Sequence, residues 1–123
     1  MAEFALPTPL GFSQVVTIPS GRLVWTSGQI GMTAEGHLGD GLEEQTRIAF
    51  QNVARALAAA GAGFEHVVRL MFFVLATDEL PVVRAVRDEF VDTAAPPTSS
   101  LVQVAGLALP GLLIEVEAVA ALP

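Results

Sequence analysis

The chain has 123 residues, of which 52% are hydrophobic and 15% charged, and its formal net charge is −7. This length suits a single domain over residues 1–123. The high apolar content excludes disorder. It also leaves surplus apolar surface that can be buried against other subunits. The chain has six arginines and no lysine, which argues against nucleic acid or anionic membranes as partners. It has no cysteine, which excludes thiolate catalysis and Cys-ligated zinc.

The N-terminal half predicts two strands and a helix. A β-branched run predicts a strand over 13–18, and a second strand over 22–27 follows a Pro-Ser-Gly turn, so the two form a hairpin. Five glycines punctuate a loop over about 28–41. Apolar residues at helical spacing then predict a helix over 42–60, with Gly61 as the left-handed residue after it.

The C-terminal half predicts a strand, a second helix and two more strands. The nearly continuous apolar run over 67–75 is typical of a central strand covered on both faces. A helix over 78–91 has Pro81 in its first turn, and strands are expected over 98–104 and 112–120.

The order β-β-α-β-α-β-β predicts one α+β domain, with one sheet and two helices on one of its faces. The opposite face of the sheet must then meet water or another subunit. In the last strand, Glu115 and Glu117 share one face because side chains alternate along a strand.

The residues taken alone offer little catalytic equipment. No HExxH, GxSxG, GxGxxG or phosphate-loop motif occurs. His37 and His66 are isolated, whereas metal binding and general-base catalysis need convergent partners, so we expect no metal. The backbone at Ser27-Gly28 either approaches a ligand or forms a strand-end bulge. If its face of the sheet is open to water, Glu115 is simply solvated. If that face packs on another subunit, the carboxylate needs a hydrogen-bond partner or has a raised pKa.

Several segments, in order and at matching intervals, resemble the RidA/YjgF family, also called the endoribonuclease L-PSP family. They are Gly-Phe-Ser-Gln at 11–14, Val-Trp-Thr-Ser-Gly-Gln-Ile at 24–30, Glu-Gln-Thr-Arg at 44–47, Val-Val-Arg at 67–69, the stretch from Pro97 to Ala105, and Ile-Glu-Val-Glu-Ala at 114–118. The resemblance covers nearly the whole chain.

The resemblance implies a chorismate-mutase-like fold and a homotrimer whose sheets pack inward as a barrel, with small-molecule sites in clefts between subunits. Archetypal members hydrolyse the enamine and imine products of amino-acid dehydratases to a 2-keto acid and ammonia, without a cofactor. Carried over by position, Ser27 and Gly28 border the pocket, Glu115 positions the attacking water, and Phe12 keeps the ring of an archetypal tyrosine.

One position departs from the archetype. The family pattern places Ser99 where an arginine clamps the substrate carboxylate. An arginine binds a carboxylate through two charge-assisted hydrogen bonds, whereas a serine hydroxyl is one neutral donor. We therefore expect archetypal 2-imino acids to bind poorly, with Ser99 and Ser100 orienting another ligand, unless Arg84 or Arg69 restores the positive charge.

The sequence thus predicts a cytoplasmic RidA-family enzyme with deaminase-type hydrolysis of an imine, an enamine or a related small compound. The alternative is a non-catalytic small-ligand-binding or regulatory trimer of the same family. The acidic chain has no basic groove for RNA, which disfavours a ribonuclease. The start of the chain has no basic segment followed by an apolar one, and no apolar run is long enough for a membrane span.

Overall fold

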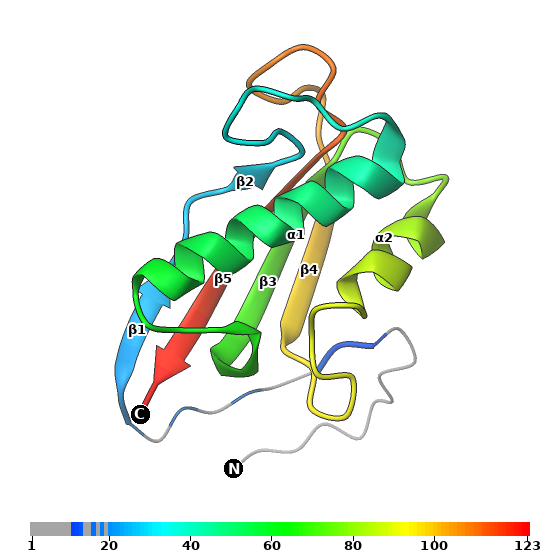
Figure 1. The fold of residues 1–123 in the computed structure, drawn as a ribbon. Helices are drawn as coiled ribbons and strands as arrows, with labels where there is room; N and C mark the ends of the chain where they lie inside the picture. The colour runs from blue at the N-terminus through cyan, green and yellow to red at the C-terminus, as the bar shows by residue number, and fades with distance from the viewer. Residues whose placement is uncertain (1–10, 14–15, 17, 19) are drawn as a thin grey trace.

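The computed structural model describes residues 11–13, 16, 18 and 20–123. Its elements are β1 (Arg22–Trp25), β2 (Gln29–Ile30), α1 (Gly41–Ala59), the 3-10 helix η1 (Phe64–His66), β3 (Val67–Val74), α2 (Leu80–Arg87), β4 (Thr98–Gln103) and β5 (Ile114–Leu122). Both α-helices lie on one face of a single sheet (Figure 1). The predicted α+β architecture is therefore confirmed.

The sheet has the strand order β1-β5-β3-β4, and β2 pairs with β5 beyond the end of β1. β5 runs antiparallel to β1, β2 and β3, whereas β3 and β4 are parallel. Parallel neighbours need a crossover connection, which α2 supplies. The crossover makes β4 an edge strand of the sheet, with α2 lying beside it (Figure 1).

The apolar stripe of α1 faces the sheet. Phe50, Val53 and Leu57 have no exposed surface. Phe50 is central to the core, because its ring lies 5.2 Å from that of Phe90 and 5.9 Å from that of Phe72 (centroid to centroid). The helix ends as predicted, since Gly61 has a φ of +78° in the left-handed region that glycine adopts without strain.

The two faces of the sheet differ because side chains alternate along each strand. In β5, Ile114, Val116 and Ala118 are buried beneath the helices, whereas Glu115 and Glu117 point to the opposite face and are half-buried. We call this opposite face the outer face. The predicted pairing of the two glutamates on one face is confirmed.

The outer face keeps apolar surface. Trp25 and Leu23 are 69% and 56% exposed, and their β5 partners share the face of Glu115. Within the described residues no element covers this face. The strand over Val67–Val74 is therefore central but covered by helices on one face only, with Arg69 exposed and Phe73 half-buried on the other.

Three predicted elements need comment. Half of the strand predicted over 13–18, at 14, 15 and 17, lies outside the described residues, so the predicted hairpin stays a prediction. β1 itself pairs with β5. The loop over 28–41 contains β2 and a Met32–Leu38 bridge, which are too short to leave a periodic pattern. The second helix is shorter than predicted and ends at Arg87, because the N–H of Phe90 bonds the carbonyl of Arg87 three residues back, in a tighter turn.

Candidate functional site

A cavity of about 130 Å³ lies between α2 and the edge strand β4. Its walls include four residues that the sequence selected: Phe12, Arg84, Ser99 and Ser100. The other lining residues are Phe72, Leu80, Val83, Arg87 and Leu101. The cavity therefore combines the Ser99 hydroxyl, two arginine side chains and an apolar wall. The Ser100 side chain, in register with Met71 and Glu117, points to the outer face.

The register of β4 aims Ser99 at the cavity. Ser99 pairs with Leu70 of β3, which is buried beneath the helices, so Ser99 lies on the helix side of the sheet. Because β4 is an edge strand, the space beside it is bordered by α2 rather than by another strand. Thr98 anchors the start of β4 through its hydroxyl, which donates to the carbonyl of Val68 at 2.9 Å.

Phe12 reaches the cavity because its neighbour is tied to the turn before β4. The backbone N–H of Ser13 donates to the carbonyl of Pro97 at 2.9 Å, and its hydroxyl donates to the carbonyl of Pro96. These bonds hold the ring of Phe12 at one wall, half-buried.

The two arginines of α2 differ in burial. Arg84 is half-buried, whereas Arg87 is only 7% exposed, and its Nε donates to Asp88 Oδ1 at 2.9 Å. The sequence indicated Arg84 but missed Arg87. The available signal was their spacing of three residues, which places them on the same helix face. Arg69 does not line this cavity, since it lies on the outer face with Nη2 3.6 Å from Met71 Sδ.

Glu115 and Gly28 meet on the outer face. Glu115 pairs with Ile30 of β2 on one side and with Phe73 of β3 on the other. A Cβ built on Gly28 would lie 2.0 Å from Glu115 Oε2, which is too close for real atoms. Only glycine therefore leaves room for this carboxylate. Ser27, also predicted as a pocket residue, is exposed beside it.

Within one chain these two groups lie on opposite faces of the sheet. The cavity with Phe12, Arg84 and Ser99 is on the helix face, and Glu115 with Gly28 is on the outer face. The structure thus gathers the predicted residues into two separate groups. A single copy does not bring the carboxylate to the cavity.

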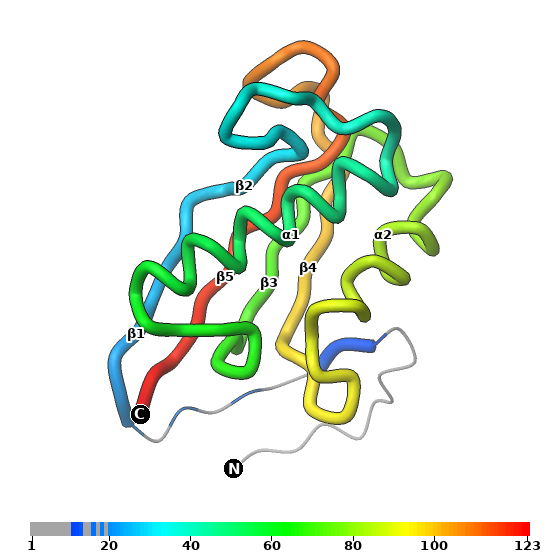
Figure 2. The backbone as a smooth tube through the Cα atoms, viewed as in Figure 1, coloured from blue at the N-terminus to red at the C-terminus, as the bar shows by residue number. Residues whose placement is uncertain are grey.

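A buried glutamine joins the loop before α1 to the loop before β5. Gln45 is 2% exposed, and its Nε2 donates to the carbonyls of Gly39 and Gly111 at 3.1 and 2.9 Å. Its Oε1 accepts from the N–H of Leu113 at 2.8 Å, one residue before β5. The loops before α1 and before β5 lie side by side at one end of the molecule (Figure 2), held there by this side chain.

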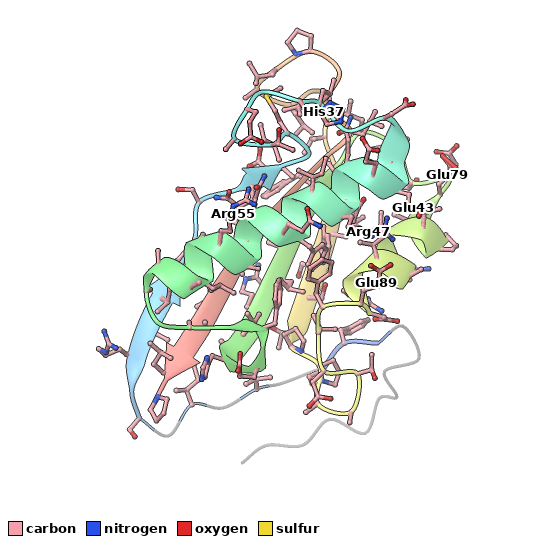
Figure 3. All side chains as sticks on the ribbon, viewed as in Figure 1. His37, Glu43, Arg47, Arg55, Glu79 and Glu89 are labelled. Atoms are coloured by element: carbon pink, nitrogen blue, oxygen red, sulfur yellow. The ribbon has the colours of Figure 1, made fainter. Side chains whose placement is uncertain are left out.

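Some of the other charged groups form ion pairs at the surface. Arg47 of α1 lies between Glu43 and Glu89 (Figure 3), with its Nη2 2.6 Å from Glu89 Oε2. The hydrogen bond from Arg47 holds the pKa of Glu89 below its ordinary value. The N–H of Asp40, with a smaller contribution from the His37 ring, lowers the pKa of Glu44.

The histidines have local roles. His37 Nε2 is 3.2 Å from Glu44 Oε2 at the surface, and His66 Nδ1 accepts from the N–H of Gly63 at 3.0 Å. No group of three or more His, Asp or Glu residues within the described ranges is placed to hold a metal ion.

The chain also matches known proteins along nearly all of its length. The family model for endoribonuclease L-PSP matches residues 4–122. Protein DfrA of Myxococcus xanthus is 35% identical over 118 residues, which are 93% of this chain and 88% of that protein. The 2-iminobutanoate/2-iminopropanoate deaminase of Dermatophagoides farinae is 30% identical over 98 residues, which are 77% of this chain and 75% of that protein.

A solved structure shows the same fold. The crystal structure of the Rid-family protein YyfB from Yersinia pestis has a TM-score of 0.80 and 36% sequence identity, and covers 93% of this chain and 89% of that one. The chain therefore belongs to the endoribonuclease L-PSP family, which is the RidA/YjgF family that its motifs resemble. Among the residues described, no helix has the length and apolar character needed to cross a membrane.

Proposed function

We propose that this protein is a cytoplasmic deaminase-type hydrolase that acts on the C=N bond of a small imine, or of the enamine in equilibrium with it. The observation that carries the proposal is the Glu115 carboxylate held against Gly28, with no side chain between it and the backbone. The relative named as a 2-iminobutanoate/2-iminopropanoate deaminase supports the reaction type.

The chemistry requires one oriented water. Glu115 accepts a hydrogen bond from that water and takes its proton as the oxygen bonds to the imine carbon. The C=N π electrons move to nitrogen, which takes up the proton held by Glu115. The carboxylate then removes the hydroxyl proton of the tetrahedral intermediate and passes it to the nitrogen, and the C–N bond breaks to release ammonia as the C=O bond forms. No electron leaves or enters the substrate, so the protein needs no redox cofactor for this step.

Two copies are needed to complete the site. Because Glu115 and the Ser99 cavity lie on opposite faces of one sheet, the outer face of one copy must approach the α2 edge of a neighbour. The exposed Trp25 and Leu23 supply apolar surface for that contact. We propose the homotrimer that the family resemblance implies, for which sedimentation equilibrium should give the mass of three chains.

Within this site we assign substrate contacts to Phe12, Ser27, Gly28, Ser99, Ser100 and Arg84, and the water-orienting role to Glu115. Ser99 stands where the archetype has an arginine, so we expect the substrate specificity to differ from that of arginine-bearing relatives. The same absence favours the second candidate, a non-catalytic ligand-binding trimer.

A coupled assay separates the two functions. A pyridoxal-dependent serine or threonine dehydratase generates the imine in solution, and ammonia and 2-oxo acid are followed with and without this protein. We expect the protein to accelerate release beyond spontaneous hydrolysis. Small ligands that raise the Tm of the protein and are recovered unchanged, with no acceleration of ammonia release, would favour the binding role instead.

A further inference from the structure

The guanidinium group of Arg87 is buried against the backbone of Gly11. Arg87 is the last residue of α2 and is only 7% exposed. A Cβ built on Gly11 would lie 2.4 Å from Arg87 Nη2, closer than real atoms approach, and its three nearest atoms all belong to that guanidinium. The arginine therefore occupies the space that a side chain at position 11 would need.

Gly11 permits this contact in two ways. Its lack of a Cβ lets the guanidinium approach the backbone. Its φ of +79° lies in the left-handed region, which glycine adopts without strain and other residues rarely adopt. A substitution at this position would therefore strain the backbone and also push against Arg87.

The short segment that begins at Gly11 is held at both of its ends. Gly11 rests on Arg87, and Ser13 is bonded to the carbonyls of the two prolines before β4. The segment lies beside the loop that leads from α2 to β4 (dark blue in Figure 1). Phe12 is placed between the two anchors and lines the cavity. One contact with α2 and one with the turn before β4 thus set the position of Phe12.

The guanidinium is fixed from its other side by Asp88. Nε of Arg87 donates to Asp88 Oδ1 at 2.9 Å, a charge-assisted hydrogen bond. Apolar residues of similar volume often stabilise a fold as well as a buried ion pair does, so burial alone does not account for an arginine here. Its long stem and rigid planar end suit contact with the backbone of a segment distant in the sequence.

We propose that Arg87 is a positioning residue, which holds Phe12 at the cavity wall through Gly11 and does not itself bind the substrate. The inference rests on the proposed function for the reaction that Phe12 serves, but the placement of residue 12 can be measured without turnover. In the proposed site Phe12 borders the ligand, whereas Glu115 orients the water. Release of the segment should therefore weaken substrate binding more than it slows the chemical step.

A single introduced thiol tests the placement of residue 12, because the chain has no cysteine of its own. Phe12→Cys is labelled with iodoacetamide, a neutral reagent, both alone and combined with Arg87→Met. We expect loss of the guanidinium to speed labelling by about fivefold or more, because the segment detaches from α2. Removal of a nearby cation by itself disfavours the reactive thiolate and slows labelling, so a faster reaction reports exposure.

Two controls separate positioning from a general loss of stability. Val53→Ala opens the core beneath α1, and Arg22→Met removes an exposed arginine of β1. Neither should change the labelling rate of Phe12→Cys by more than about twofold. If Arg87→Met does not fold, Gly11→Ala displaces the segment from its own side and should also speed labelling. No gain in either of these two variants, or an equal gain in Val53→Ala, would overturn the proposal.

Steady-state kinetics connect the placement to the proposed reaction. Arg87→Met should raise KM for the imine by about fivefold and change kcat by less than about twofold, since the contact with Phe12 is made in the ground state and the transition state alike. A fall in kcat with unchanged KM would contradict the positioning role. Labelling that depends on Arg87 in a protein without imine hydrolysis would overturn only the proposed function. Hydrolysis with labelling independent of Arg87 would overturn only the positioning role.

Discussion

The carboxylate of Glu115 rests against the α-carbon of Gly28, so closely that a Cβ at position 28 would lie 2.0 Å from Oε2. The pair joins the middle of the sheet to the bend between β1 and β2, on the face without helices. Gly28 thus determines where the Glu115 carboxylate can be, and its role is one of space rather than of special backbone conformation.

Gly28→Ala should reduce activity far more than stability. The three nearest atoms to the new methyl group all belong to the flexible side chain of Glu115, which can swing away at little cost. The displaced carboxylate would then misplace the water, and a shift of about 1 Å can cost about a hundredfold in rate. Ammonia release and Tm should be measured together, with Gly106→Ala as control, because nothing lies within 4 Å of a Cβ there. A fall in Tm that accounts for the lost activity would contradict this role.

Ser99→Arg should fail to improve binding of 2-oxo acids. The cavity of about 130 Å³ already contains Arg84 and Arg87, so a third guanidinium meets like charge and little room. We expect acid affinity to stay unchanged or weaken by up to about fivefold. Ser99→Thr controls for crowding at the strand. Tighter binding or faster 2-imino acid turnover in Ser99→Arg would contradict this expectation.

Gln45→Leu should destabilise the fold by about 3 kcal/mol, since it leaves buried carbonyls and an N–H without their partner. Chemical denaturation gives the free energy of unfolding directly. Gln51→Leu, at an exposed position of the same helix, is the control and should change it little. Equal effects of the two substitutions would mean that the Gln45 bonds do not hold the loops before α1 and β5.

The Arg47–Glu89 pair predicts a pH dependence of stability. The folded pKa of Glu89 is lowered, chiefly by the hydrogen bond from Arg47, so the folded state binds its proton less tightly than the unfolded state. The contribution is complete above the ordinary pKa of 4.5 and is lost as pH falls through the lowered value. The Tm difference between wild type and Glu89→Gln should therefore shrink below pH 4.5 at low salt. Glu35→Gln at an exposed turn controls for net charge, and a difference independent of pH would contradict the pairing.

Sequence periodicity was a good guide to the faces of the elements. Alternation separated Glu115 from Ile114 and Val116, and helical spacing selected Phe50, Val53 and Leu57, all of which are buried as expected. These patterns succeed because burial of one face is a local property of a strand or helix.

Sequence reasoning missed features that depend on how elements dock. Arg87 enters the cavity because α2 lies beside the edge strand β4, and no local pattern specifies that contact. β2 has two residues and owes its existence to pairing with β5. The placement of Ser99 and Glu115 on opposite faces of the sheet depends on the register of β4 against β3, which no local pattern specifies.

The rate of ammonia release from a freshly generated imine, compared for wild type, Glu115→Gln and Glu117→Gln, tests the central claim most directly. Both glutamates lie on the outer face of β5, but only Glu115 lies against Gly28. The proposed role predicts that Glu115→Gln lowers the accelerated rate by about a hundredfold or more, while Glu117→Gln stays near wild type. Full acceleration by Glu115→Gln, or equal losses in both variants, would contradict the assignment of Glu115 as the residue that orients water.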